Sequence, residues 1–297
     1  MQPAATPGAA VAQPDITAVQ GYVIKDTEVR DLPSRLLQRN YQLYVSLPET
    51  YQDEPQRKYP VLFVTDAPYA FPLIRSIGRR VGDHGKGLEE FILIGLSYAN
   101  GDTPKYSRDR DYTPTADNRG RSYESGMPGR PLIYGEAEAY RRFIAEEVFP
   151  FVARSYRADM GRKIYAGHSY GGLLGIHMLL TEPTMFEHYI LGSPSLWFNQ
   201  KVMFEREKTY AAAHKDLPAD VFMAVGSFET LNPSSDDPRY DHEDDMVRDL
   251  QKFERRLKSR GYPSLRVQTK VVDDEDHLTV FPAIITRGLT HMLPPRT

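Results

Sequence analysis

The stretch Lys163–Gly172, KIYAGHSYGG, constrains the fold of this chain more than any other. A short apolar run leads into Gly167-His168-Ser169-Tyr170-Gly171, and apolar residues then recur at helical spacing. A G-x-S-x-G pattern between a strand and a helix predicts a nucleophile elbow, a sharp turn that exposes a serine hydroxyl at a helix N-terminus. The alternative is an ordinary glycine-rich turn in which Ser169 only caps the helix.

The composition narrows the function classes. The chain of 297 residues, 40% of them hydrophobic, can form one large α/β domain or two small ones. A net charge of −3 provides no basic field for nucleic acid or an anionic membrane. No run reaches the roughly 18 apolar residues of a membrane span. There is no cysteine, which excludes thiol chemistry, and the histidines lack metal-ligand spacing, so we expect neither a metal site nor a cofactor.

Residues 1–20 are rich in Ala, Pro, Gln and Gly, and they have neither the charged start nor the apolar core of a signal peptide. We expect a flexible lead of the kind that remains once a signal is removed, which predicts an exported, periplasmic protein. A disordered N-terminus of a cytoplasmic protein is the alternative.

The first half of the chain predicts strands that become more deeply buried along the sequence. Asn40–Leu47 alternates apolar and polar residues, as an antiparallel strand with one wetter face does. Pro60–Thr65 and Phe91–Leu96 are continuously apolar, which is typical of strands buried on both faces of a parallel sheet. A helix is expected between them, near Tyr69–Val81. This order fits an α/β-hydrolase sheet of about eight mostly parallel strands flanked by helices.

Residues 98–135 form a stretch too long for an ordinary strand–helix connection. Arginines and tyrosines alternate along it, and several aspartates partly balance the arginine charges. Its place after a buried strand puts it above the carboxyl edge of the sheet, where α/β proteins bind ligands. We interpret it as a substrate-facing insertion, with a solvated loop as the alternative.

The second half supplies the remaining elements of what we predict to be a single domain over residues 21–297. Glu136–Tyr156 has an amphipathic helical pattern in which Pro150 predicts a bend or break. Strands are expected over Met185–Leu191, Ala219–Val225 and Leu265–Val272. Two helices are also expected: one contains Met246 to Leu257 and is capped by Gly261, and the other spans Thr279–Met292.

A serine nucleophile needs a base within hydrogen-bond reach, and in this fold the partners follow in the order serine, acid, histidine. Only His277 and His291 follow the last predicted strand. His277 lies in the loop directly after that strand, so we predict it as the base. Glu229, just past the preceding strand, is the predicted acid. The alternatives are Asp236, Asp237 and Asp241, an acid from residues 273–276, or a Ser–His pair with no carboxylate.

The oxyanion hole of such a site is built from two backbone N–H groups. Tyr170, the residue after the nucleophile, should provide one. The other should come from the loop after the strand at residues 60–65, which leaves Asp66 or Ala67.

Taken together, these segments resemble an esterase family of α/β-hydrolases that contains esterase D-like enzymes and the trilactone esterases of enterobactin and salmochelin. The resemblance rests on the order of several motifs: PVLFVTDA, RDRDYTPT, FIAEEVFPFVARSYR, GHSYGG, SPSLW and DEDH. It implies hydrolysis of carboxylic esters through an acyl-enzyme, with Ser169 and His277 at the catalytic positions. It also implies a substrate-binding role for Arg121 or Arg130 in the insertion and for Trp197 in SPSLW.

Three functions follow as hypotheses. The first is a siderophore trilactone esterase, because arginine- and tyrosine-rich loops can contact an anionic, aromatic iron complex by charge and stacking. The second is a general carboxylesterase for small acyl or phenolic esters. The third is a binding protein that has kept the hydrolase fold without its activity, which the presence of both Ser169 and His277 disfavours. In each case the partner is a small molecule.

Overall fold

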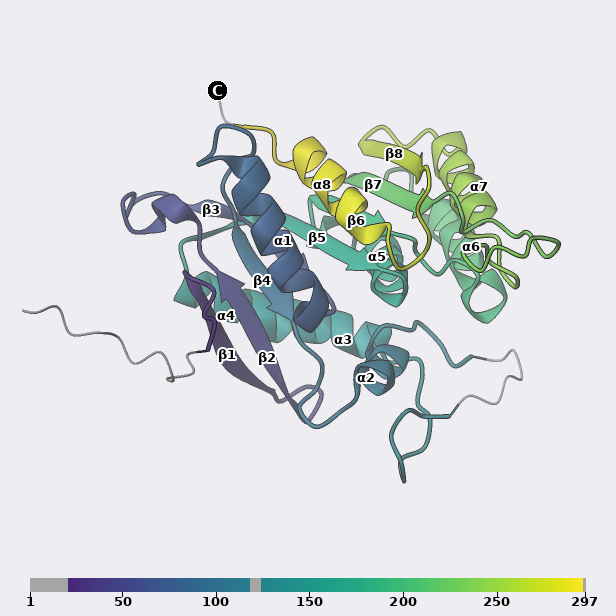
Figure 1. Cartoon of the computed structure of the whole chain (residues 1–297), viewed down its shortest axis with the longest axis horizontal. Coiled ribbons are helices and arrows are strands. Elements are labelled where there is room, and N and C mark those ends of the chain that lie inside the picture. The colour runs from purple at the N-terminus through teal and green to yellow at the C-terminus, as the bar shows by residue number, and fades with distance from the viewer. Residues whose placement is uncertain (1–20, 118–123, 296–297) are drawn as a thin grey trace, which may run out of the picture.

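The computed structural model describes residues 21–117 and 124–295, and it is organised around one eight-stranded sheet (Figure 1). The strands lie in the order β1-β2-β4-β3-β5-β6-β7-β8. β1 pairs antiparallel with β2 and β2 pairs antiparallel with β4, whereas every later pairing is parallel. The strand bounds are β1 Thr27–Ser34, β2 Arg39–Ser46, β3 Tyr59–Val64, β4 Ile92–Leu96, β5 Ala158–His168, β6 His188–Gly192, β7 Ala219–Gly226 and β8 Leu265–Val272.

Helices cover both faces of the sheet (Figure 1). α1 and α8 pack against each other on one face, and their side chains share a core with the strand residues that point to that side. The larger core on the other face is closed by α3 to α7. The helix bounds are α1 Ala67–Gly82, α2 Pro104–Asp111, α3 Ala137–Phe143, α4 Phe149–Ser155, α5 Tyr170–Thr181, α6 Phe198–Ala213, α7 Met246–Ser259 and α8 Phe281–Met292.

Burial along the strands follows the sequence patterns, and the predicted α/β-hydrolase architecture is confirmed. Every residue of β3, β4 and β7 is buried, as their unbroken apolar runs predict for strands with a helix layer on each side. In β2, Tyr41, Leu43 and Val45 are buried while Gln42 and Tyr44 are less so, which reproduces the predicted alternation.

Pro150 is accommodated by a change of helical register. α3 and α4 are joined without a gap by a π-helical turn at Ile144–Val148, and Pro150 follows as the second residue of α4. Proline cannot donate the i→i−4 hydrogen bond, and its ring clashes with that carbonyl. The wider π-helical turn just before Pro150 takes that carbonyl out of the i→i−4 pattern. The break predicted at Pro150 is therefore a local widening within one continuous helical run.

The sequence patterns missed two helices. α6 was not predicted, and α2 lies inside the stretch at 98–135 that was expected to be irregular. Thr103 caps α2 by accepting a hydrogen bond from the Tyr106 N–H at 3.2 Å, and Pro104 occupies the first helical position. The predicted strand at residues 185–191 begins later, at His188, after a short 3₁₀ turn.

Two further expectations concern the chain ends and membranes. The predicted lead at residues 1–20 lies outside the described residues. Within the parts of the chain that are described, no helix is long and apolar enough to cross a bilayer.

Candidate active site

Ser169 occupies a strained turn between β5 and α5. Its backbone has φ 60° and ψ −117°, values that a residue with a side chain rarely adopts. The turn is held by the Ser169 N–H, which donates to the Gly192 carbonyl at 2.9 Å. A Cβ on Gly167 would lie 2.5 Å from the Gly171 oxygen, and one on Gly171 would collide with Thr65. The predicted elbow therefore needs its glycines for space, and its conformation is not that of a simple N-cap.

His277 meets Glu229 as the chain order predicts. β7 ends three residues before Glu229, and β8 ends five residues before His277, so both lie beyond the carboxyl edge of the sheet. The His277 Nδ1 and Glu229 Oε2 atoms are 2.6 Å apart. Because a carboxylate can only accept, Nδ1 carries the proton. That leaves Nε2 as the nitrogen able to take a proton from a nucleophile.

Glu229 is almost fully buried, with 2% of its surface exposed, and both of its oxygens are satisfied. Oε1 accepts from the Ser193 hydroxyl at 2.6 Å and from the Gly226 N–H at 2.8 Å. A buried carboxylate that accepts from several donors is held in one orientation. Glu229 can therefore stabilise a protonated His277.

The alternative acids and base have other contacts. Asp237 and Asp274 both pair with Arg239, and Asp241 accepts from the backbone N–H groups of Glu243 and Asp244. His291 lies on α8, 3.7 Å from Asp220. Of the predicted candidates, only Glu229 is in contact with His277.

The loop that carries His277 is fastened to the end of β7. The Phe228 N–H donates to the Glu275 carbonyl, and the Asp274 N–H donates to the Ser227 hydroxyl, both at 3.0 Å. A side chain on Gly226 would collide with Glu275, so the two segments approach as closely as backbones can. On the other side, the Met246 N–H donates to the Glu229 carbonyl at 2.9 Å, which closes the polar segment 230–245 into a loop.

Ser169 and His277 line one cavity of about 570 Å³. Its walls come from the loop after β3, from α1 and α2, and from the start of α8. The lining residues are Thr65, Asp66, Tyr69, Ala70, Tyr98, Pro104, Lys105, Arg108, Asp109, His168, Ser169, His277, Leu278 and Phe281. A concave, half-open space at the carboxyl edge of an α/β sheet is where such proteins take their ligands.

Of the predicted substrate residues that the structure describes, neither Arg130 nor Trp197 is among these lining residues. Arg130 instead donates to Asp102 at 3.0 Å and lies over the Tyr106 ring. Trp197 packs with its ring centroid 5.9 Å from that of Tyr170. Arg121 lies outside the described residues.

Among the residues that the structure describes, Arg108 is the arginine that lines the cavity, and the sequence showed it only as one of several arginines in the insertion. Its Nε lies 3.0 Å from Asp66 Oδ1, an ion pair whose angle is too poor for an aligned hydrogen bond. Its guanidinium also lies 5.6 Å from the Tyr170 ring centroid. α2, the helix that the sequence patterns missed, is what places Arg108 here.

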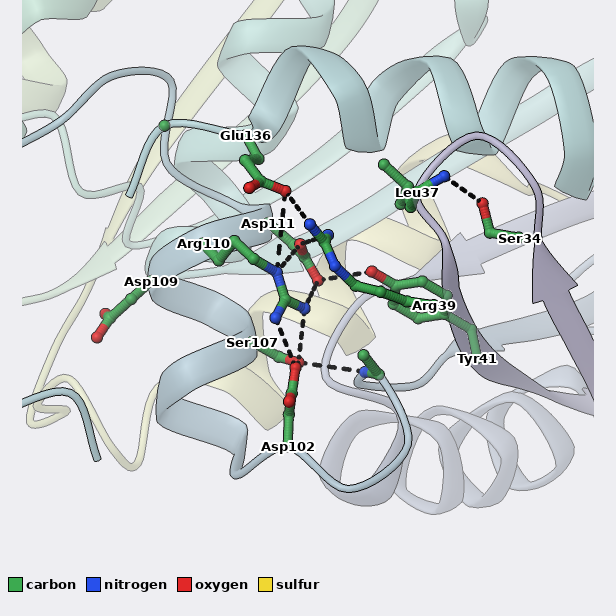
Figure 2. A network of polar contacts seen from close by, with 12 residues as sticks. Ser34, Leu37, Arg39, Tyr41, Asp102, Ser107, Asp109, Arg110, Asp111 and Glu136 are labelled. Atoms are coloured by element: carbon green, nitrogen blue, oxygen red, sulfur yellow. Dashed lines mark hydrogen bonds and ion pairs between the residues drawn. The ribbon is translucent and has the colours of Figure 1, made fainter. Parts of the chain in front are cut away.

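The position of α2 is fixed by a buried polar network, seen in Figure 2. Arg110 binds both oxygens of Asp111, at 2.7 and 2.8 Å, and donates to Asp102 at 2.6 Å. Asp111 also accepts from Arg39 at 3.1 Å and from the Tyr41 hydroxyl at 3.0 Å. The network ties the insertion to β2, and Asp111 itself is 1% exposed.

Two helix starts lie where the oxyanion donors are expected. Tyr170 and Ala67 are the first residues of α5 and α1, so their N–H groups have no acceptor within the helix. They directly follow Ser169 and Asp66, which line the cavity. The Asp66 N–H instead points to the Tyr112 hydroxyl at 3.4 Å. Of the two predicted candidates in that loop, the geometry favours Ala67.

Asp66 shapes this corner through its side chain. It adopts a left-handed conformation, with φ 56° and ψ 43°, and its carboxylate accepts from the Tyr98 hydroxyl at 2.7 Å. Together with Arg108, Tyr98 therefore holds the residue that precedes Ala67.

His168 lies beneath His277 as a neutral ring. Its Nε2 is 2.8 Å from the His277 carbonyl, so this nitrogen donates, and the two rings are 4.7 Å apart between centroids. Burial, together with the charge of a protonated His277, lowers the pKa of His168 to about 3. His168 therefore supports the loop of the base without competing for the proton.

Among the described residues there is no group of three or more His, Asp or Glu that could hold a metal ion. The chemistry that the site can perform is attack by Ser169 on a carbonyl carbon, with proton transfer through His277.

Comparison with known proteins agrees with this chemistry. The model of the family described as "Putative esterase" matches residues 34–262. The ferri-bacillibactin esterase BesA of Bacillus subtilis is 30% identical over 286 residues, which cover 92% of each chain. A siderophore triacetylfusarinine C esterase of Aspergillus fumigatus is 32% identical over 268 residues, 84% of this chain and 87% of the relative.

Solved structures are similar over the same extent. The BES protein from Bacillus cereus superposes with a TM-score of 0.76 at 26% identity, covering 93% of this chain and 99% of that one. An IroE-like serine hydrolase from Shewanella oneidensis superposes with a TM-score of 0.72 at 25% identity, covering 89% of this chain and 79% of that one. The sheet order, the strained serine and the matched family lead to one conclusion: the chain belongs to this esterase family and is a carboxylic-ester hydrolase.

Proposed function

We propose that the chain hydrolyses the lactone esters of a siderophore through an acyl-enzyme on Ser169. The observation that carries the proposal is that Ser169 and His277 line one cavity of about 570 Å³, with His277 hydrogen-bonded to Glu229 behind it. The relatives named above, over most of their length, are esterases of siderophores by name.

We infer the first half of the reaction from the position of these residues around one cavity. Ser169 Oγ forms a bond to the ester carbonyl carbon while His277 Nε2 takes the hydroxyl proton. The carbonyl oxygen becomes an oxyanion, which the N–H groups of Tyr170 and Ala67 stabilise, each worth about 3 kcal/mol in such sites. Glu229 stabilises the imidazolium through Nδ1.

The second half releases the products. The tetrahedral intermediate collapses, the ester C–O bond breaks, and His277 returns its proton to the departing alcohol oxygen. Water then attacks the acyl carbon with His277 again as base, and the acid leaves Ser169. In a cyclic lactone the leaving alcohol stays attached to the acid, so the first turnover opens the ring.

Incubation with an enterobactin-type trilactone, followed by mass spectrometry, tests the proposal. The wild type should give a linear product heavier by one water and then shorter fragments, while Ser169→Ala should give none. Running the iron-free and ferric forms in parallel tells which of the two is the substrate. A trilactone that stays intact in both forms contradicts the siderophore function.

One observation favours a second candidate, a general carboxylesterase. The two cations of the described cavity lining are both neutralised: Arg108 pairs with Asp66, and Lys105 lies 2.6 Å from Asp109. The cavity therefore offers little net charge for an anionic iron complex. Hydrolysis of small neutral esters with an intact trilactone would support this candidate.

We also propose that the protein acts outside the cytoplasm, on the composition of residues 1–20. Fractionation of the cells that naturally produce it, with an antibody against the protein, tests this. Recovery in the cytosolic fraction alone contradicts an exported location.

A further inference from the structure

The strand β1 forms one edge of the sheet, at the end opposite to β7 and β8 and the loops that carry Glu229 and His277 (Figure 1). Within the described part of the chain, β1 pairs with β2 alone, over eight residues in one unbroken register. Three large apolar side chains stay exposed in this strand or just before it: Tyr22, Val23 and Val29. An edge of this length is a template for a further strand.

The order of hydrogen bonds tells which residues of β1 face this edge. The Leu47 N–H donates to the Asp26 carbonyl at 3.0 Å, one step before the ladder begins at Thr27. In an antiparallel ladder, every second residue bonds to the neighbouring strand, and the residues between them direct their N–H and C=O groups to the other side. Thr27, Val29 and Asp31 therefore offer their backbone groups to a strand beyond β1.

The side chains of β1 alternate between the two faces of the sheet. Glu28 and Arg30 share one face, where they form an ion pair at 3.8 Å with 40% and 47% of their side chains exposed. Glu28 also accepts from the Tyr156 hydroxyl. Val29 points to the opposite face and is 56% exposed. An exposed ion pair contributes little within one chain, so both charges are available to a partner.

We propose that this edge pairs with the same edge of a second copy of the chain, with Val29 opposite Val29 at the two-fold axis. In this register Glu28 of each copy lies opposite Arg30 of the other, and the outward backbone groups of Thr27 meet those of Asp31. Registers centred on Glu28, Arg30 or Asp31 bring like charges together at the axis. A shift by a single residue would place opposite side chains on different faces.

The other edge of the sheet lacks this complementarity. β8 carries two cations, Arg266 and Lys270, and no acid. Self-pairing of β8 would therefore form no ion pair between its two copies in any register. Edge lysines keep strands apart, whereas the opposite charges of β1 select one partner, a copy of the same strand.

Charge reversal tests the register. Analytical ultracentrifugation of the full chain should show twice the mass of one copy. Glu28→Arg and Arg30→Glu should each raise the dimer Kd about tenfold, since like charges then face each other across the axis. Mixing the two variants should restore association as a heterodimer, because every arginine then meets a glutamate. Lys270→Glu, on β8, should leave the Kd unchanged.

Activity shows whether the variants have folded. No residue of β1 is among those that line the catalytic cavity. Glu28→Arg and Arg30→Glu should therefore keep the ester hydrolysis rate and the circular dichroism spectrum of the wild type. Association that is lost together with this spectrum and is not restored by mixing would reflect misfolding and overturn the proposal.

An introduced cysteine tests the contact at the axis. The chain has no cysteine, so Val29→Cys gives one thiol per copy. Opposite residues that exchange hydrogen bonds lie about 5.5 Å apart between Cα atoms, which a disulfide can span. Oxidation of Val29→Cys should give a covalent dimer, whereas Val271→Cys, at a position 38% exposed on β8, should not.

Three results would overturn the proposal. The first is a wild type that stays a single copy at every soluble concentration, which would leave the edge to residues 1–20 or to a foreign strand. The second is a dimer whose Kd neither charge reversal changes. The third is equal cross-linking of Val29→Cys and Val271→Cys, which would show that the thiols meet by random collision.

Discussion

The Ser193 hydroxyl donates a hydrogen bond of 2.6 Å to Glu229 Oε1, the carboxylate oxygen that does not contact His277. Ser193 is fully buried and has φ 39°. Glu229 thus orients His277, and Ser193, which directly follows the neighbouring strand β6, orients Glu229. Outer hydrogen-bond partners orient metal ligands in the same way.

Replacing Ser193 by Gly should weaken catalysis without removing it, because Glu229 loses one of the donors that hold its orientation toward His277. Glycine tolerates the positive φ, so the backbone should keep its course. We expect kcat to fall about tenfold with KM nearly unchanged. A role in folding alone would lower the amount of active protein and leave kcat per folded molecule at the wild-type value.

Glu229→Gln should be more severe. The amide cannot stabilise an imidazolium, and it can present its NH₂ to His277, which favours the wrong tautomer. The expected loss of kcat is about 10²–10⁴-fold. Asp237→Asn is the matched control, since Asp237 was an alternative acid and pairs with Arg239. We expect a near-wild-type kcat for Asp237→Asn. A loss as large as that of Glu229→Gln would identify Asp237 as the catalytic acid instead.

Arg110→Met should destabilise the fold. The change leaves Asp102 and Asp111 buried with too little positive charge, and breaking a buried ion pair costs about 3–5 kcal/mol. Urea unfolding followed by circular dichroism measures the free energy of unfolding. Arg142→Met, which removes a solvent-exposed pair with Glu146, should leave it unchanged. Equal stability of both variants would contradict a structural role for the network in Figure 2.

Stability should fall as the solution becomes acidic, in part through His177. Its Nε2 lies 3.2 Å from Glu138 and its Nδ1 is 2.6 Å from Arg206. Burial and then the charge of Arg206 lower the pKa of His177 from 6.5 to about 4. Between these pH values the unfolded chain binds a proton that the folded one does not, so the free energy of unfolding decreases as pH falls.

The measurement compares the wild type with His177→Gln at pH 7 and pH 5. The wild type should lose about 1–2 kcal/mol more than the variant over this interval, because glutamine has no proton to take up. Identical losses would show that His177 does not contribute to the acid sensitivity.

The elbow and its partners could be predicted because they depend on order along the chain. In a parallel sheet, residues just past successive strands meet at one edge. Ser169, Glu229 and His277 therefore needed only correct strand assignments. The apolar run of β7 made the strand before Glu229 easy to assign, since β7 is buried on both faces, and the runs of β3 and β4 marked the same sheet.

The insertion could not be predicted in the same way, because polar pairings rather than apolar periodicity determine it. α2 buries Tyr106, Ser107, Asp109, Arg110 and Asp111, a set with no helical apolar stripe. Only the Thr103-Pro104 start carried a helix signal. Each arginine of the insertion is positioned by the aspartate with which it forms an ion pair, and this pairing decides which arginine lies at the cavity. Arg130 pairs with Asp102 and is not among the residues that line the cavity, whereas Arg108 pairs with Asp66 and lines it.

Glu229 has two separate roles: its side chain contacts the catalytic base, and its backbone carbonyl closes the segment 230–245 into a loop. The Glu229 carboxylate faces His277, while its carbonyl accepts the Met246 N–H at 2.9 Å and pins the far end of the segment. The residues between also contact the end of β7 and the His277 loop, because the Asp241 N–H donates to the Phe228 carbonyl and Arg239 pairs with Asp274. A replacement confined to residues 233–236, the stretch outside these contacts, should therefore not move the acid. This makes that stretch a graft point, where new recognition elements can be added beside an unaltered catalytic centre.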